Sequence, residues 1–221
     1  MKENLTELVF ILDKSGSMSG LEKDTIGGFN SFIKKQKEEA GDAILSTILF
    51  SNRFDVLHDR INIKEVKELT DKDYFASGCT ALLDAIGYSI KHIMKVHNEL
   101  KDEDKPSKTL FVITTDGLEN ASTEFRYHQI NQLINKTKEE GFEYLFLGAN
   151  IDAKCEASKM GIKKENAVNY NCDEDGIDIC YGVLNTAVKE MRINGKIEEE
   201  WCKDIEEDFK IRTQGTTKKS K

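Results

Sequence analysis

The chain has 221 residues and a formal net charge of −8, with 38% hydrophobic and 33% charged residues. This length is enough to bury one substantial core, and the balance is typical of a soluble globular protein rather than a disordered one. The acidic excess argues against nucleic acid as a partner, because proteins that bind phosphate backbones normally carry a basic surface.

The composition also indicates where the protein is located and which kinds of metal site are disfavoured. No apolar run approaches the length that spans a bilayer, and no signal-peptide core follows Met1, so we expect a cytoplasmic protein without a membrane partner. The five cysteines are odd in number, none forms a C-x-x-C pair, and there are only four histidines. A disulfide framework, a structural zinc site and a histidine-rich metal site are therefore disfavoured.

The first part of the chain alternates between strand and helix patterns. Residues 6–13 (TELVFILD) form a continuous apolar run that ends in an aspartate, which predicts a central strand buried on both faces. A Ser/Gly-rich loop over residues 14–20 precedes a predicted helix that ends near Glu39 and is stopped by Gly41. Its apolar positions recur at helical spacing: Ile26, Phe29 and Ile33.

A predicted hairpin comes next. Residues 44–51 and 54–63 have strand patterns and are joined by Asn52-Arg53, which is typical of antiparallel neighbours. A polar excursion over residues 64–78 leads to a predicted helix over 81–97. Its apolar positions are Leu83, Ile86, Ile90 and Ile93.

The rest of the chain repeats the alternation. Strands are predicted over 109–115, which Asp116 follows, over 142–147 and, weakly, over 167–170. Helices are predicted near 124–139 and 153–160, and two more have the apolar positions Leu184, Val188 and Met191, and Ile197, Trp201 and Ile205. We expect Trp201 to pack in the core rather than anchor a partner.

This alternation predicts an α/β fold, in which a doubly wound, mostly parallel sheet with one antiparallel edge strand is covered by helices on both faces. Nothing between residues 5 and 210 resembles an interdomain linker, so we expect one domain over 1–212. Residues 213–221 are predicted to form a frayed basic tail.

Polar residues gather where the ends of the parallel strands are expected to meet. Asp13, Ser15 and Ser17 follow the first strand, Asp116 follows the strand over 109–115, and Thr80 lies in the loop between them. Ligands of open parallel sheets bind at this edge. Two carboxylates and three hydroxyls make an all-oxygen site, which suits a hard divalent cation such as Mg²⁺.

This pattern resembles the metal-ion-dependent adhesion site (MIDAS) of von Willebrand factor A-type (vWA) domains, the integrin I-domain-like fold, over roughly residues 5–150. The resemblance implies a Rossmann-like fold that holds Mg²⁺ or Mn²⁺, with an Asp or Glu of a protein partner as the missing ligand. It implies hydroxyl ligands at Ser15, Ser17 and Thr80 and carboxylates at Asp13 and Asp116. Cys79 and Lys14 depart from the common pattern without removing a ligand.

Residues near the motif have competing interpretations. Asp84 is expected to stabilise a helix N-terminus or to bond a site loop rather than touch the ion. Glu119 and Asn120 either rim the site or belong to a solvated loop. Lys14 is expected to help attract the partner's carboxylate.

Three functions remain open. The leading hypothesis is a non-enzymatic, metal-dependent protein-binding module. The second is a hydrolase with Ser15 or Ser17 as the nucleophile, or with Asp13 as a phosphoryl acceptor, although neither serine lies in G-x-S-x-G and no P-loop motif is present. The third is a structural subunit of a larger complex.

Overall fold

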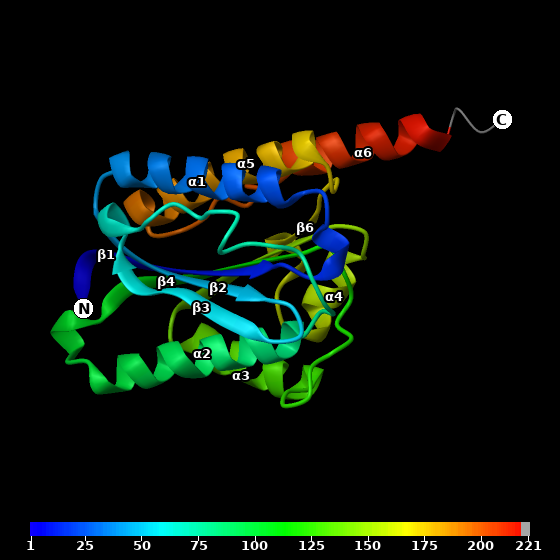
Figure 1. Ribbon diagram of the computed structural model, residues 1–221. Helices are drawn as coiled ribbons and strands as arrows, with labels where there is room; N and C mark the ends of the chain where they lie inside the picture. Colours follow the sequence, from blue (N-terminus) through cyan, green and yellow to red (C-terminus); the bar gives the residue numbers. More distant parts are fainter. Residues whose placement is uncertain (218–221) are drawn as a thin grey trace.

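The computed structural model describes residues 1–217, and at its centre lies one six-stranded sheet (Figure 1). The order across the sheet is β3-β2-β1-β4-β5-β6, and all neighbours are parallel except β2 and β3. The strands are β1 (Lys2–Asp13), β2 (Asp42–Phe50), β3 (Phe54–Asn62), β4 (Pro106–Thr115), β5 (Phe142–Gly148) and β6 (Ala167–Asn169). The predicted mostly parallel sheet with one antiparallel edge strand is confirmed.

Helices cover both faces of this sheet, as the doubly wound fold requires (Figure 1). One face packs against α1 (Glu22–Glu38), α5 (Glu174–Asn194) and α6 (Lys203–Thr217). The other packs against α2 (Leu82–Glu99), α3 (Tyr127–Glu139) and α4 (Ala153–Lys159). Short 3-10 turns are η1 (Gly16–Met18), η2 (Ile63–Glu65), η3 (Asp102–Asp104) and η4 (Lys164–Asn166). Within residues 1–217, no helix combines the length and apolarity needed to cross a bilayer.

The apolar run of β1 explains its central position. Leu8, Phe10 and Leu12 point into the core under α1 and α5, while Val9 and Ile11 point into the core over α2 and α3. All five side chains have no exposed surface. Successive strand residues point to opposite faces, so a run without polar residues is stable only where both faces are covered.

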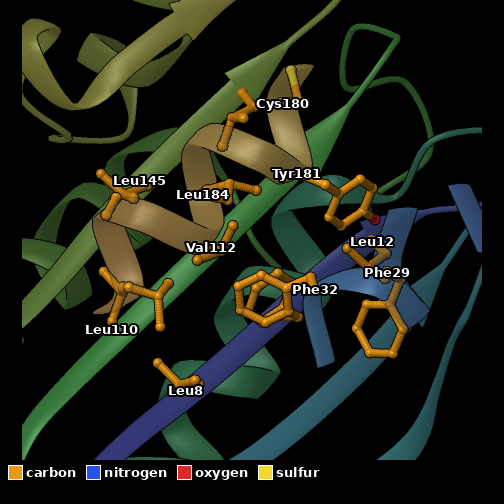
Figure 2. Close-up of a cluster of buried hydrophobic side chains, with 14 of the residues drawn as sticks. Leu8, Leu12, Phe29, Phe32, Leu110, Val112, Leu145, Cys180, Tyr181 and Leu184 are labelled. Atoms are coloured by element: carbon orange, nitrogen blue, oxygen red, sulfur yellow. The ribbon is translucent and has the colours of Figure 1, made fainter. Parts of the chain in front are cut away.

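Helices α1 and α5 pack closely against the sheet and against each other. Figure 2 shows Phe29 and Phe32 of α1 and Tyr181 of α5 gathered around Leu12 of β1. A Cβ placed on Gly28 would lie 2.2 Å from Cδ2 of the Tyr181 ring. Only a glycine at this position therefore lets α1 and α5 pack at their observed separation.

The chain after α5 differs from the sequence expectation. Ile197 and Trp201 were expected to lie on the last helix, but α6 begins only at Lys203, and this expectation is wrong. Trp201 instead lies in a turn, is 9% exposed, and donates its indole N–H to the Glu165 carbonyl at 2.9 Å. Its expected burial in the core is confirmed. Ile197 is only partly buried, and a four-residue spacing between two apolar side chains does not by itself require a helix.

The expected tail begins at Thr213, but the backbone of α6 continues to Thr217. Residues 218–221 of that predicted tail lie outside the described residues. The single domain over 1–212 and the tail remain predictions.

Replacing Gly28 with alanine should destabilise the protein by about 1–3 kcal/mol, because the new methyl group would overlap the Tyr181 ring in a packed core. Equilibrium urea unfolding measures this change. Gly27→Ala is the matched control: its Cβ meets nothing within 4 Å, so better helix propensity should leave stability unchanged or raised. Equal effects of the two variants would contradict the packing argument.

Candidate metal centre

The carboxyl ends of β1 and β4, which are neighbours in the sheet, bring residues from three loops together. Asp13 ends β1, Asp116 directly follows β4, and Thr80 lies just before α2. These three side chains and Ser15 are buried, with exposed fractions of 1–3%, whereas Ser17 in η1 is exposed. The five residues singled out in the sequence thus meet at one sheet edge, and Ser17 forms the side that faces solvent.

Hydrogen bonds join four of these residues into a chain. The Ser15 backbone N–H donates to Oδ1 of Asp13 at 2.7 Å. The hydroxyl oxygens of Ser15 and Ser17 lie 3.1 Å apart, and Ser17 donates to Oδ1 of Asp116 at 2.7 Å. The two serine hydroxyls therefore lie between the two carboxylates.

Thr80 approaches the same group from another loop. A Cβ placed on Gly117 would lie 3.4 Å from the Thr80 hydroxyl oxygen and 3.7 Å from that of Ser17. Both distances are ordinary van der Waals contacts, so the hydroxyls of Thr80 and Ser17 flank the backbone position directly after Asp116.

Backbone contacts hold the loops in register. The Gly16 N–H donates to the Gly78 carbonyl at 2.9 Å, and the Ser77 N–H donates to the Lys14 carbonyl at 2.9 Å. Gly78 has φ +80°, and Asn52 Oδ1 accepts from the Cys79 N–H at 2.6 Å. Glycine adopts this backbone conformation without the strain that other residues incur. The loop that carries Thr80 is thereby fixed against the loop that carries the serines.

Two residues that the sequence analysis did not single out hold Asp13 in place. The Thr115 hydroxyl donates to Oδ2 of Asp13 at 2.6 Å, and the buried Tyr74 hydroxyl donates to the Asp13 backbone carbonyl. Thr115 ends a run of β-forming residues, where a threonine is ordinary. The available signal was its position immediately before Asp116, on the neighbouring strand to Asp13.

Acidic and amide side chains around the site accept hydrogen bonds from backbone N–H groups of the surrounding loops and of the start of α2. Asn120 Oδ1 accepts from the Thr80 N–H at 2.9 Å, and a Glu119 carboxylate oxygen accepts from the Leu83 N–H at 2.8 Å. Asp84 accepts from the backbone N–H groups of residues 123–125. The expectation that Asp84 bonds a site loop is confirmed. Glu119 and Asn120 therefore lie at the rim of the site and support its loops, with Glu119 half-buried and Asn120 exposed.

The expectation for Lys14 is wrong. Its side chain is 7% exposed and its Nζ pairs with Oδ2 of Asp55 in β3 at 2.7 Å. The same Nζ lies 4.9 Å from the centre of the Phe75 ring. Lys14 thus turns towards the hairpin strand and is not free to attract a partner's carboxylate. Its direction depends on β3, which the motif alone does not reveal.

The electrostatics of the site favour a cation. Burial raises the pKa of Asp13 to about 6, although hydrogen bonds from Thr115 and Ser15 oppose the rise. Burial also raises the pKa of Asp116. Among the described residues, the buried Oδ2 of Asp116 has no hydrogen-bond partner. An unpaired, buried carboxylate oxygen is costly, and a bound cation offsets that cost.

The donor set fits a hard divalent cation. Among the side chains that the structure describes, no group of three or more His, Cys, Asp or Glu is placed to hold a metal, so a metal site here depends on hydroxyl oxygens. Two carboxylates and three hydroxyls are all oxygen donors, which Mg²⁺ and Mn²⁺ accept. The residues present therefore fit the ion that the sequence pattern predicts.

No family model and no curated protein matches the sequence. Solved structures, by contrast, resemble its fold at low identity. Proximal thread matrix protein 1 from the mussel byssus, solved with a zinc-occupied MIDAS motif, has a TM-score of 0.57 at 14% identity, over 83% of this chain and 48% of its own. This chain thus spans about half the length of the mussel protein.

One bacterial protein and one parasite protein have the same fold. The von Willebrand factor domain of the pilus tip protein Mfa5 from Porphyromonas gingivalis has a TM-score of 0.57 at 10% identity, over 84% of this chain and 97% of its own. The manganese-loaded TRAP protein of Plasmodium vivax has a TM-score of 0.53 at 15% identity, over 81% and 73% respectively. The shared architecture over more than four-fifths of the chain shows that this protein has the von Willebrand factor A-type fold.

Proposed function

We propose that this protein is a metal-dependent protein-binding module that holds Mg²⁺ or Mn²⁺ and uses it to bind an acidic residue of a partner. The observation that carries the proposal is the buried, unpartnered Oδ2 of Asp116 within a cluster of hydroxyl oxygens. The zinc-occupied MIDAS of the mussel protein and the manganese-loaded TRAP protein support it, because they share this fold. The cytoplasmic location expected from the sequence is likewise a proposal, which cell fractionation tests.

Each residue has a distinct part in this proposal. Asp13 and Asp116 neutralise the ion, directly or through water, and the hydroxyls of Ser15, Ser17 and Thr80 supply neutral oxygen ligands. The bound ion would supply a positive centre for a carboxylate from outside the chain. Exposure of Ser17 leaves this side of the site open to a partner.

Charge makes the proposed binding conditional on the metal. Asp13, Asp116 and the nearby carboxylates of Asp84 and Glu119 all lie at one end of the sheet. Without the ion, this acidic edge repels an acidic ligand. We therefore expect an affinity pull-down to recover a partner in Mg²⁺ and to lose it in EDTA or with Asp13→Ala. A partner profile that survives EDTA and Asp13→Ala would favour a structural scaffold instead.

One observation keeps a hydrolase as the second candidate. Ser17 donates to Asp116 at 2.7 Å, which is the geometry of a hydroxyl beside a general base. No histidine of residues 1–217 hydrogen-bonds to Ser15 or Ser17, and none of the three structures described above is named as an enzyme. Metal-dependent turnover of ester or phosphate substrates that Ser17→Ala abolishes would establish the hydrolase and contradict the binding module.

Asp116→Asn should weaken Mn²⁺ binding at least tenfold in isothermal titration calorimetry, because the variant keeps the shape of the side chain but removes its charge. Asp102→Asn is the control for net charge, since Asp102 lies in η3 before β4, at the opposite edge of the sheet. Its Mn²⁺ affinity should match that of the unmodified protein. Unchanged affinity in Asp116→Asn would remove Asp116 from the site.

Thr115→Val should weaken Mn²⁺ binding roughly tenfold without removing a ligand, because groups that orient metal ligands typically contribute 10–100-fold to affinity. The variant deletes the hydrogen bond to Oδ2 of Asp13 and keeps the branched shape. Thr109→Val, at the other end of β4 and also buried, is the control. If both variants lose affinity equally, general destabilisation rather than Asp13 positioning is responsible.

A further inference from the structure

A groove of about 550 Å³ opens at the same sheet edge as the candidate metal centre. Its walls come from the loops after β4, β5 and β6 and from α6. Leu118, Ile151, Tyr170 and Phe209 supply an apolar lining. Leu118 is 54% exposed and forms the open rim of this apolar lining.

The groove lies beside the metal centre along the same sheet edge. Leu118 lies two residues after Asp116, and Thr115, which holds Asp13, accepts the Ala149 N–H at its backbone carbonyl at 2.9 Å. The Tyr170 N–H in turn donates to the Gly148 carbonyl at 3.1 Å. These bonds tie the ends of β4, β5 and β6 side by side. In Figure 1, α4 and the end of α6 lie towards this edge of the sheet. An extended segment bound at the metal would therefore pass over Leu118 into the groove.

The charged side chains that line the groove are all acidic. Its only charged lining residues within the described chain are Asp152 and Glu156. Glu156 is already engaged, because it pairs with Lys159 at 2.5 Å and accepts from the Tyr127 hydroxyl at 2.8 Å. Asp152 is exposed, uses Oδ1 to cap α4 through the Cys155 N–H, and forms no ion pair with any side chain that the structure describes. Asp152 thus presents a negative charge at the edge of an apolar floor.

We propose that this groove binds a lysine or arginine side chain of the same partner segment that presents its carboxylate to the metal. The inference rests on the proposed function and adds the second recognition element. The aliphatic stem of the basic residue lies along Leu118, Ile151 and Phe209, as such stems do on apolar surface, and its charged head meets Asp152. The partner is thereby defined as a peptide segment with an acidic and a basic residue at fixed spacing.

Selection from a random linear-peptide library tests this inference. The immobilised full chain is loaded with Mn²⁺, and bound peptides are released with EDTA. The same selection runs on Asp152→Asn, which removes the charge but keeps a good helix-capping residue, and on Asp102→Asn as the charge control. Asp152→Asn should bind Mn²⁺ as the unmodified chain does, which establishes that its metal centre is intact.

The expected result is a pool enriched in both an acidic residue and a Lys or Arg at constant spacing on the unmodified chain and on Asp102→Asn. On Asp152→Asn, the acidic residue should persist and the basic enrichment disappear. For one selected peptide, a Lys→Met change should weaken binding to the unmodified chain up to about fivefold, as for a solvent-accessible ion pair, and should not weaken binding to Asp152→Asn.

Two further outcomes separate the inference from the proposed function. Acidic enrichment without basic enrichment on the unmodified chain, or basic enrichment that persists on Asp152→Asn, would overturn the role of the groove and leave the metal-dependent module standing. A pool that EDTA does not release, or that lacks an acidic residue, would overturn the proposed function together with the inference.

Discussion

Two carboxylates buried at neighbouring strand ends are the constraint on which the rest of this structure depends. Asp13 ends β1 and Asp116 directly follows β4, and these parallel strands pair in the centre of the sheet, with Leu12 opposite Thr114. This pairing brings both negative charges to one edge, largely out of reach of water. Burial raises the pKa of each carboxylate, so the ionised site is unfavourable unless a cation is present.

The loops around the carboxylates reduce the freedom of the site. Gly16 and Gly78 allow two loops to meet backbone to backbone, and Asn120 holds the Thr80 N–H. The hydroxyls therefore stand close to the carboxylates in the folded chain without having to be ordered when a ligand arrives. Such preorganisation favours binding, because the entropy of ordering these groups has already been lost in folding. It agrees with a recognition module whose affinity depends on the ion.

Much of this arrangement was predictable from the sequence. Continuous apolar runs identified the buried strands, and the residues after each run identified the edge at which Asp13, Ser15, Ser17, Thr80 and Asp116 meet. The part that could not be predicted depends on packing between distant segments. Lys14 turns towards Asp55 because β3 lies beside it, and Thr115 supports Asp13 across a strand pair. The spacing of Ile197 and Trp201 does not mark a helix, because Trp201 lies in a turn where its indole N–H reaches the carbonyl of the distant residue Glu165.

The groove could not be predicted from the sequence for the same reason, because it depends on packing between distant segments. Leu118, Asp152 and Phe209 are far apart in the chain and carry no motif, yet the ends of β4 and β5 and the helix α6 bring them to one surface. In the proposed mode of binding, the metal centre would supply metal dependence and the groove would supply selectivity among acidic partners. The two features lie on the same edge because the strand order β1-β4-β5-β6 places their loops in sequence.

The most direct test of the central claim is a crystal structure of the protein grown with Mn²⁺, with anomalous scattering recorded to locate the ion. The account predicts an anomalous peak among the oxygens of Asp13, Ser15, Ser17, Thr80 and Asp116, bound to Oδ2 of Asp116 directly or through water. A structure in saturating Mn²⁺ with no peak at this position, or with the ion only elsewhere, would contradict it.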